Sequence, residues 1–496
     1  MPPPAPPCRR RRRLTPLPSL LLVAMLLLLL LLLLLCFSSQ PASAAGRTVT
    51  HLPGFHAPLS FHLETGLVFS GGCSYVGVDD HDDVQLFYYF IQSERDPADD
   101  PLLLWLTGGP GCSALSGLAF EIGPITFHKA RYDGSLPTLV LRPNSWTKVA
   151  NIIFLDSPVG TGFSYSRNPE GFKVGDMSSS RQVVTFLRKW LEEHPQFISN
   201  PFYVAADSYA GKVTPIIAHL ISEDMENGEK PVINLKGYLI GNAITGERFD
   251  YMSRIPFLHG MGIISDELYK STMDYCEGQD YDVPETAKCA EKLNIVKQFL
   301  SELSDGFILD PKCPFASPRP EGTKGERRSL CPYTGQKKIP PPDLDVECRT
   351  YSYYLSYYWA NNNLARQALH IHEGTVNEWQ RCNLVVNQGT YTQEIESVIK
   401  FHLDLTTRGY RALVYNGDHD PSIPFQGTLA WIKSLNFSVV EDWRSWFVDG
   451  QVAGYTMLYS NNLTFATVKG AGHTAPEYKS KECLAMLQRW VSHKPL

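Results

Sequence analysis

The stretch "PFYVAADSYAGKVTPIIAHLISEDME", residues 201–226, decides the fold of this chain. Its first half is a short apolar run that predicts a buried strand, and its second half has the apolar spacing of a helix. The turn between them, "ADSYA", places Ser208 between small residues. A tight strand-to-helix turn lifts a serine hydroxyl above a sheet, where it can act as a nucleophile. The alternative is that Ser208 only caps the helix that follows.

The same alternation of strand and helix extends in both directions from this stretch. Apolar runs that end in glycine or charged turns predict strands, and segments with 3.6-residue periodicity predict helices. The predicted strands lie at 84–93, 101–109, 150–162, 235–244, 411–420 and 464–476, and the predicted helices at 182–194 and 480–493. This order predicts an α/β fold, with a mostly parallel central sheet and helices on both faces.

The segment at about 250–360 differs in composition from the rest. Cysteines cluster there, and "PFASPRPEGTKGERRSLCPYTGQKKIPPPD" is polar and rich in proline. Such composition predicts an insertion with a long loop rather than sheet core. The exposed basic stretch "PRPEGTKGERR" within it suggests proteolytic cleavage into two disulfide-linked chains.

The N-terminus has the pattern of a targeting segment. Arg9–Arg13 form a basic start, residues 20–37 an apolar core, and "ASA" at 42–44 a cleavage site between small residues. We predict a signal peptide at 1–44, followed by a single domain at 45–496. The apolar run is also long enough for an uncleaved membrane anchor. In both cases the chain enters the secretory pathway, with the vacuole or the extracellular space as its destination.

The composition excludes several partners. With 43% hydrophobic and 19% charged residues, the chain is globular. Its net charge is −6. Because the leader contributes the five positive charges of Arg9–Arg13, the net charge of the remaining chain is more negative than this value. This charge argues against nucleic acid as a partner, and against a membrane once the leader is cleaved. No cofactor is predicted, since the glycine-rich "TGGPGCS" lacks the G-K-[ST] ending of a phosphate loop.

The cysteines and two sequons fit a secreted protein. Eleven cysteines occur, two of them in the leader, and the absence of a C-x-x-C pair argues against a metal site. Disulfides are therefore expected, and the odd number outside the leader leaves at least one thiol over. Asn436 and Asn462 begin the sequons "NFS" and "NLT" and are predicted glycosylation sites.

Partners for Ser208 occur in the order that this kind of nucleophile requires, namely serine, acid and histidine. "VYNGDHDPSIP" places Asp420, our choice for the acid, and Asp418, the alternative, on a turn after a strand. "VKGAGHTAP" places His473 on a glycine-rich loop, where an imidazole can act as general base. Each of these residues could alone be an ordinary turn or surface residue, but the ordered set predicts a catalytic triad.

A third motif supplies candidate oxyanion donors. "TGGPGCS", residues 107–113, ends a strand with three glycines in four residues. Without side chains, backbone N–H groups can approach a substrate and stabilise a developing oxyanion. The alternative is an ordinary tight turn.

Together these motifs resemble the plant serine carboxypeptidase-like proteins. The resemblance rests on "WLTGGPGCSALSGLAFEIGP", "DSPVGTGFSYS", "ADSYAG", "GYLIGNAIT", "NGDHDPSIP" and "KGAGHTAPE", and runs from about His51 to the C-terminus. It implies an α/β-hydrolase fold with a helical insertion, or lid, over the active site. It also implies a Ser208–Asp420–His473 triad and an oxyanion hole made by the backbone N–H groups of Gly109 and Tyr209.

The resemblance implies disulfides as well. The implied pairs are Cys112 with Cys382, Cys276 with Cys289, and Cys313 with Cys348. Cys73, Cys331 and Cys483 remain without a partner from the family pattern.

Two positions separate the peptidases of this family from its acyltransferases. The peptidases usually have Asn before the first glycine pair and Glu before the nucleophile, where both hold a peptide's terminal carboxylate. This chain has Thr107 and Asp207 there and keeps Glu121 in "FEIGP". We expect these residues and Gly108 to bind substrate, with one carboxyl of the acidic pair protonated. The alternative is that Asp207 only caps the following helix.

Thr107 and Asp207 resemble the acyltransferase branch of the family. The predicted function is transfer of an acyl group from a 1-O-β-glucose ester to an acceptor through an acyl-serine intermediate. The alternative is a serine-type carboxypeptidase that acts on peptides. A non-catalytic binding protein on the same scaffold is a third possibility, against which the intact triad argues. The sequence does not predict the oligomeric state.

Overall fold

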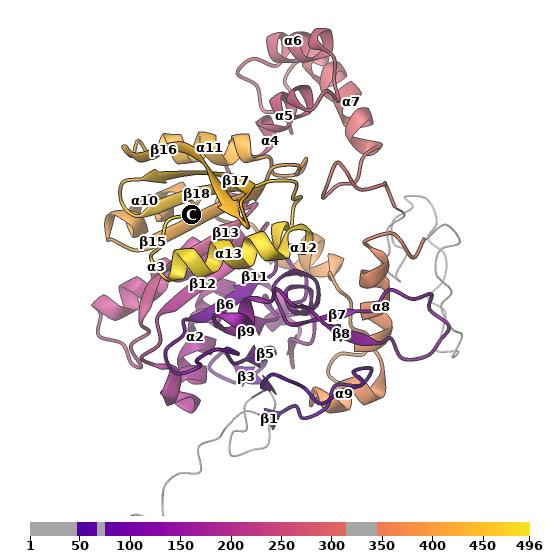
Figure 1. Cartoon of the computed structure of the whole chain (residues 1–496), viewed down its shortest axis with the longest axis vertical. Coiled ribbons are helices and arrows are strands. Elements are labelled where there is room, and N and C mark those ends of the chain that lie inside the picture. Colours follow the sequence, from indigo (N-terminus) through magenta and orange to yellow (C-terminus); the bar gives the residue numbers. More distant parts are fainter. Residues whose placement is uncertain (1–46, 67–74, 314–344) are drawn as a thin grey trace, which may run out of the picture. The chain divides into compact units, whose positions relative to one another are not determined.

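An 11-stranded mixed sheet is the centre of the computed structural model, which describes residues 47–66, 75–313 and 345–496 (Figure 1). Across the sheet, the strands follow in the order β1 (Arg47–Thr48), β2 (Leu63–Thr65), β5 (Tyr88–Ile91), β9 (Asn151–Leu155), β6 (Leu102–Leu106), β12 (Phe202–Asp207), β13 (Leu235–Gly241), β15 (Arg411–Gly417), β18 (Leu463–Val468), β17 (Gln451–Tyr459) and β16 (Val439–Val448).

Parallel pairing is confined to the middle of this sheet. Every neighbouring pair from β9 to β18 is parallel, whereas β1, β2 and β5 on one side and β17 and β16 on the other pair antiparallel. The predicted mostly parallel sheet thus describes the centre, where the carboxyl ends of the strands meet at one edge and can assemble a site.

The predicted single strand at 84–93 is wrong in one respect, because it is two strands in different sheets. β4 (Val84–Leu86) pairs with β3 (Val76–Gly77) and β10 (Tyr165–Ser166), while β5 belongs to the main sheet. Phe87 lies between them, and its N–H donates to the Ser164 hydroxyl at 2.8 Å. A side chain therefore takes the place of a strand partner at the point where the chain changes sheets.

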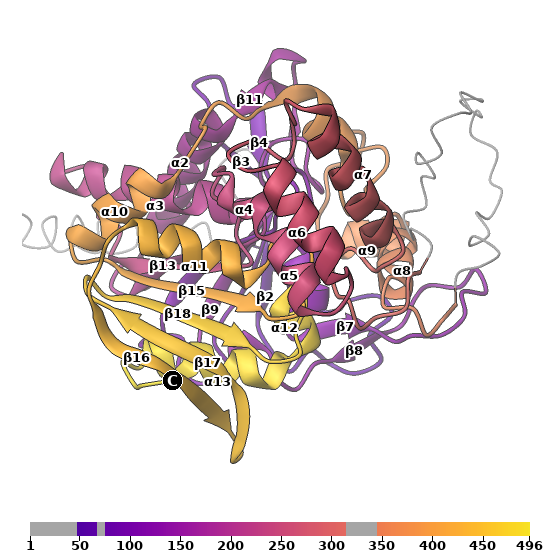
Figure 2. The ribbon, with the colours of Figure 1, turned by 90° about the horizontal axis from the view of Figure 1, so that it is seen from above.

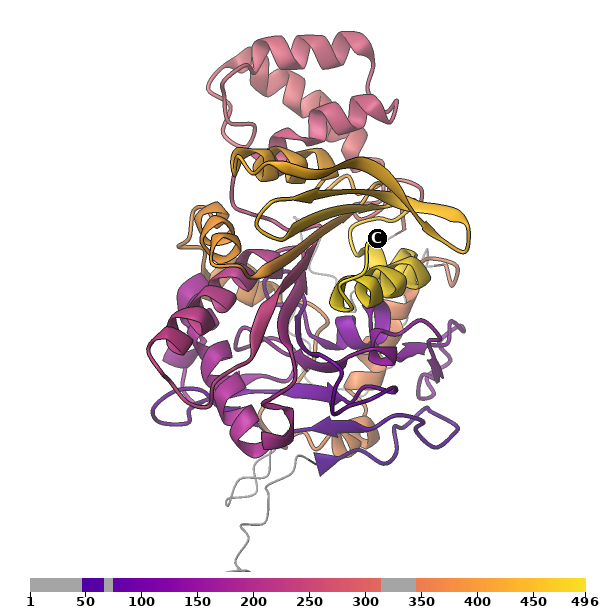
Figure 3. The same ribbon diagram turned by 60° about the vertical axis from the view of Figure 1, so that its left-hand side comes forward.

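Both faces of the main sheet are buried, as predicted. On β6, Leu103 and Trp105 belong to one apolar core, and Leu102 and Leu104 to the other. The second core also includes side chains of α2 (Asp176–Glu193), α3 (Ala210–Glu226), α10 (Ile399–Thr407) and α11 (Phe425–Ser434). The first core includes side chains of α8 (Tyr351–Ala360), α9 (Asn363–Ala368), α12 (Ala475–Tyr478) and α13 (Ser480–Val491). In Figure 3 the magenta helices α2 and α3 and the yellow helix α13 lie on opposite sides of the sheet. This layering confirms the α/β class.

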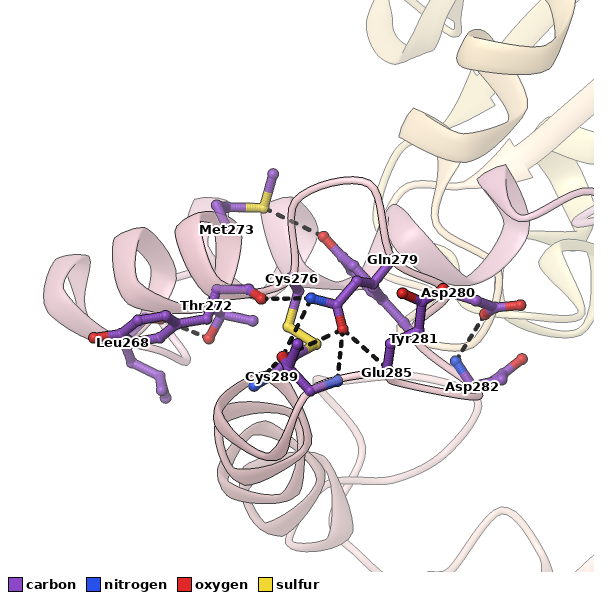
Figure 4. Close-up of a disulfide and its surroundings, with 12 residues drawn as sticks. Leu268, Thr272, Met273, Cys276, Gln279, Asp280, Tyr281, Asp282, Glu285 and Cys289 are labelled. Carbon is purple, nitrogen blue, oxygen red and sulfur yellow. Dashed lines mark hydrogen bonds between the residues drawn. A yellow bond between two sulfur atoms is a disulfide. The ribbon is translucent and has the colours of Figure 1, made fainter.

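A helical insertion follows β13. It consists of α4 (Phe249–Met252), α5 (Arg254–Gly260), α6 (Asp266–Tyr275) and α7 (Ala287–Ser301), with α4 packed on α11 (Figure 2). The insertion has an apolar core of its own, and Cys276–Cys289 joins α6 to α7 (Figure 4). Beside this disulfide, the Gln279 side chain accepts from the N–H groups of Glu285 and Thr286. The basic loop proposed for cleavage lies outside the described residues.

Among the described residues three disulfides occur, and they are the pairs that the family resemblance implied: Cys112–Cys382, Cys276–Cys289 and Cys313–Cys348. Cys483 is a buried free thiol on α13, and Cys73 and Cys331 lie outside the described residues. Both sequon asparagines, Asn436 and Asn462, are exposed in turns. Within the ranges that the structure describes, each helix is too short or too polar to cross a bilayer.

Candidate active site

Ser208 occupies a strained turn between β12 and α3. Its backbone φ is +52°, in the left-handed region that side chains disfavour. Backbone hydrogen bonds hold it there: its N–H donates to the Gly241 carbonyl at 3.0 Å, and its carbonyl accepts from the N–H groups of Gly211 and Ile244, both at 3.1 Å. A side chain at Gly108 would come within 2.6 Å of the Ser208 Cβ, so glycine is required opposite the turn. Ser208 does not cap α3, because its hydroxyl faces His473.

The predicted triad residues lie within hydrogen-bond distance of one another. The His473 Nε2 is 2.8 Å from the Ser208 Oγ, and its Nδ1 is 2.8 Å from the Asp420 Oδ2. When the Nδ1–H of His473 donates to the Asp420 carboxylate, Nε2 carries no proton and can accept the proton of the serine. Burial alone would lower the pKa of His473, but the charge and hydrogen bond of Asp420 raise it above its ordinary value.

Asp420, rather than Asp418, faces the histidine. Asp420 is fully buried and also accepts from the Asn242 amide and the Ser422 N–H, both at 2.8 Å. Asp418 instead accepts from the Gly470 N–H at 2.7 Å and lies beside His419. Of the two acids that the sequence left open, the structure therefore places Asp418 in a supporting turn. Asn242 was not predicted, although it stands in the quoted motif "GYLIGNAIT".

The two candidate oxyanion donors flank the serine from different elements. Gly109 has a φ of +127°, a conformation that only glycine adopts readily. Tyr209 immediately precedes α3, where helix geometry leaves N–H groups without an intrahelical acceptor. Backbone donors at such positions can stabilise an oxyanion formed at Ser208.

A buried carboxylate that the sequence did not single out holds the segment 107–114 after β6, which carries Gly109 and is called the oxyanion loop below. Asp156 accepts from the Ser113 hydroxyl and the Ala114 N–H at 2.8 Å, and from the Phe163 N–H at the same distance. Burial raises the pKa of Asp156 to about 6, against the opposing effect of these donors. The three bonds join the loop after β6 to the loop after β9.

Asp207 points toward the oxyanion loop. Its carboxylate is buried and accepts from the Gly108 N–H at 3.0 Å, and it does not cap α3. Burial raises the pKa of Asp207 to about 6. Glu121, which accepts from the Trp105 indole at 3.1 Å, is also buried, and burial and the charge of Asp207 hold its pKa well above the ordinary range. The acidic pair therefore retains a proton at mildly acidic pH.

Thr107 contributes a hydroxyl with unused hydrogen-bonding capacity. Its Oγ1 is buried and has no partner in the described part of the protein. A buried hydroxyl without a partner is unfavourable, so a group that supplies one on binding would be favoured there.

A second group of polar side chains lies beside the triad and was missed in the sequence. It consists of Tyr353 on α8, Arg381, Thr474 and Glu477. Tyr353 and Thr474 donate to the Glu477 carboxylate at 2.8 and 2.9 Å, and the Arg381 guanidinium lies over the Tyr353 ring. The only available signal was position, since Glu477 follows His473 by four residues and Arg381 precedes a disulfide cysteine.

No group of three or more side chains suited to a metal ion occurs among the residues with described positions.

The chemistry that the Ser208–His473–Asp420 arrangement supports is nucleophilic acyl transfer through a serine.

Comparison with known proteins agrees with this geometry. The serine carboxypeptidase family model matches residues 53–493. "Serine carboxypeptidase-like 12" and "Serine carboxypeptidase-like 14" of Arabidopsis thaliana are 46% and 47% identical to the chain, over 90% of its length and 94% of theirs. The crystal structure of Kex1(delta)p, a prohormone-processing carboxypeptidase from Saccharomyces cerevisiae, superposes with a TM-score of 0.69 at 20% identity, covering 91% of this chain and 97% of that one.

Proposed function

The chain belongs to the serine carboxypeptidase family and has its α/β-hydrolase fold, and from this premise we propose that it is an acyltransferase. The donor is a 1-O-β-glucose ester, and the acceptor is a small molecule with a hydroxyl group. Residues Ser208, His473 and Asp420 act as nucleophile, base and orienting acid. The alternative within the same family is a carboxypeptidase acting on peptides.

The proposed reaction proceeds in two halves. The Ser208 Oγ attacks the ester carbonyl while its proton passes to the His473 Nε2, and the oxyanion is stabilised by the N–H groups of Gly109 and Tyr209. The C1 oxygen of glucose leaves with the proton from His473, and an acyl-serine remains. The acceptor hydroxyl then gives its proton to His473 and attacks the acyl carbon, and Ser208 recovers its proton.

The observation that supports transfer over peptide cleavage is the bond between Asp207 and Gly108. In the peptidase pattern, Asn and Glu side chains at positions 107 and 207 hold a peptide's terminal carboxylate. Here the Asp207 carboxylate is already bonded to the Gly108 N–H, and Thr107 has no amide with which to bind a carboxylate. A site with this chemistry favours a neutral ester donor.

The assay that tests the proposal compares two substrates for the purified protein at mildly acidic pH. One reaction contains a blocked dipeptide, and the other a hydroxycinnamoyl-glucose ester with mixed alcohol acceptors, analysed by mass spectrometry. New acyl esters without peptide cleavage are expected. Release of the C-terminal amino acid without ester formation would replace the proposal by the carboxypeptidase alternative.

For localisation, we propose that residues 1–44 direct the chain into the secretory pathway, as suits a secreted-type family. Asn436 and Asn462 are then available for glycosylation, since both are exposed. Mass determination of the purified mature protein, before and after glycosidase treatment, tests cleavage after residue 44 and occupancy of both sequons.

A further inference from the structure

We propose that Arg349 is a positioning residue for His473, the proposed base, and acts through a short segment that lies against both triad loops. This segment, residues 305–310 between α7 and Cys313, is called the strap below. The inference rests on the role of His473 in the proposed function. It applies equally to acyl transfer and to the carboxypeptidase alternative, because both use the same base.

The strap holds the backbone of His473 directly. The His473 N–H donates to the Gly306 carbonyl at 2.7 Å. A side chain at Gly472 would come within 2.3 Å of that carbonyl oxygen, so a larger residue there would displace the strap. The histidine loop also bonds to the turn after β15, from the His419 N–H to the Ala471 carbonyl at 2.9 Å, but that bond ends two residues before His473. The strap therefore supplies the backbone contact of the residue that carries the imidazole.

The strap also bonds to the turn that carries Asp420. The Ile308 N–H donates to the His419 carbonyl at 3.3 Å. The Ser422 hydroxyl donates to the Asp305 carbonyl at 2.6 Å, and the N–H of the same serine donates to the Asp420 carboxylate at 2.8 Å. Because one segment contacts both loops, a shift of the strap would move the imidazole relative to its orienting acid.

Arg349 anchors the end of the strap that lies away from the triad. Its Nε donates to the Asp310 carboxylate at 2.9 Å, and its guanidinium lies 4.2 Å from the centre of the Tyr478 ring on α12. That ring packs in turn on Phe307 of the strap, with 4.6 Å between the ring centres. Since α12 follows the histidine loop directly, Arg349 joins the strap to the same element that the strap supports.

A disulfide reinforces this anchor. Cys348 precedes Arg349 directly, Cys313 follows Asp310 by three residues, and the two cysteines are bonded to each other. The side chains of Arg349 and Asp310 are 32% and 22% exposed, so their ion pair is partly shielded from solvent and salt. A guanidinium that pairs with an acid and lies over a ring has a more fixed position than an ammonium group would have.

The placement of the imidazole is expected to affect the rate of reaction more than substrate binding. Proton transfer requires the His473 Nε2 to stay within hydrogen-bond distance of the Ser208 Oγ as the reaction proceeds. A misplacement of about 1 Å costs roughly 100-fold in rate, and a contact that matters only in the transition state changes kcat rather than KM.

The first test measures labelling of Ser208 by a fluorophosphonate over a range of probe concentrations. Arg349→Gln and Asp310→Asn are each expected to lower the maximal labelling rate about tenfold, with the half-saturating probe concentration unchanged within about twofold. Arg349→Lys keeps the charge without the flat guanidinium and is expected to lose less. Arg408→Gln is the control, because that side chain is 29% exposed and also pairs with an acid, and it is expected to keep the wild-type rate.

The second test separates positioning from a general loss of structure. Asp420→Asn removes the acid against which the strap positions the imidazole. In that background, Arg349→Gln is expected to cost less than about twofold more, since the effects of coupled residues are not additive. A full tenfold further loss would assign the effect to general disorder and overturn the inference. Thermal unfolding verifies that each variant is folded at the assay temperature, and Arg349→Lys carries the test if Arg349→Gln is not.

The outcomes distinguish the inference from the proposed function. Unchanged labelling in Arg349→Gln and Asp310→Asn, or a change confined to the half-saturating probe concentration, would overturn the inference and leave the acyltransferase proposal standing. An equal loss in Arg408→Gln would overturn it as well. Rate losses confined to the strap variants, with no ester formed by the wild type from any acceptor, would overturn the proposed function and leave the inference standing.

Discussion

The Asp207 carboxylate accepts a hydrogen bond from the Gly108 backbone N–H at 3.0 Å, and so joins the nucleophile turn to the oxyanion loop. Asp207 precedes Ser208 directly, and Gly108 precedes Gly109. The bond therefore fixes the distance between the proposed nucleophile and a residue proposed to stabilise the oxyanion. An acidic residue beside the proposed serine nucleophile is thus explained by loop geometry, without a place in the proposed triad.

Substitutions of Asp207 separate its role as acceptor from its charge. Asp207→Asn keeps an oxygen that can accept from Gly108, so we expect kcat within about threefold of the wild type, since a neutral acceptor still makes the bond. Asp207→Ala leaves the buried N–H unpaired, which costs about 1–3 kcal/mol and predicts a loss of roughly 10- to 100-fold in kcat. Steady-state kinetics on an activated ester measures both. Equal losses in the two variants would show that the charge, rather than the bond, is required.

The pKa of Asp207 predicts a difference in pH dependence. Its pKa of about 6 means that the carboxyl becomes ionised as the pH rises from 5 to 7. Asp207→Asn cannot ionise, so its KM profile is expected to lose a transition that the wild type shows near pH 6. Profiles measured from pH 4.5 to 8 test this, and an unchanged transition in the variant would assign it to another group.

The two acids on the turn after β15, Asp420 and Asp418, provide a test of the triad and its control. Asp420→Asn removes the charge that stabilises protonated His473, so we expect a loss of roughly 10³-fold or more in kcat. Asp418→Asn changes a residue bonded to Gly470 and is expected to lose less than about tenfold, as for an ordinary polar contact. Ser208→Ala and His473→Ala are expected to abolish turnover. Full activity of Ser208→Ala would refute the nucleophile assignment.

Specificity is expected to depend on Thr107 and Asp207 together. Thr107→Asn combined with Asp207→Glu restores the side chains of the peptidase pattern, so we expect measurable release of C-terminal amino acids from blocked dipeptides. The single variants serve as controls, because an amide or a longer acid alone supplies only part of that arrangement. No gain in peptidase activity in the double variant would count against a role of these two residues in substrate selection.

Glu64 predicts how stability depends on pH. It is buried on β2, accepts from the Tyr88 hydroxyl at 2.9 Å and lies 2.8 Å from the His194 Nε2. Burial alone would raise its pKa, but the bonds with His194, His62 and Tyr88 lower it to about 2. A depressed acid pKa contributes stability that is present above the unfolded-state pKa of about 4.5 and is lost as the pH falls toward 2.

The corresponding experiment is urea unfolding of the wild type and Glu64→Gln at several pH values. At pH 6 the variant is expected to be less stable by about 3 kcal/mol, an order-of-magnitude figure from the pKa difference. This difference is expected to shrink as the pH falls from 4.5 toward 2. A difference that stays constant over this range would mean that ionisation of Glu64 does not stabilise the fold.

The local pattern of residues 201–226 was sufficient to predict β12, the Ser208 turn and α3, because apolar periodicity reflects which side of an element is buried. The order of the motifs likewise identified the family and the candidate triad. These features are encoded within about a dozen neighbouring residues each, so they are visible without a structure.

Tertiary structure decided the features that depend on contacts between distant residues. His473 meets Asp420 and Ser208 across 53 and 265 residues, and that packing places Asp420, rather than the alternative Asp418, at the imidazole. The antiparallel hairpin of β16 and β17 and the split at Phe87 depend on which strands pair, which apolar spacing does not specify. The position of Arg381 over Tyr353 arises because a disulfide and two backbone bonds bring its segment to the oxyanion loop. The sequence determines which reactive side chains the chain carries. Which of them lie in contact is determined by the packing of distant segments in the folded protein.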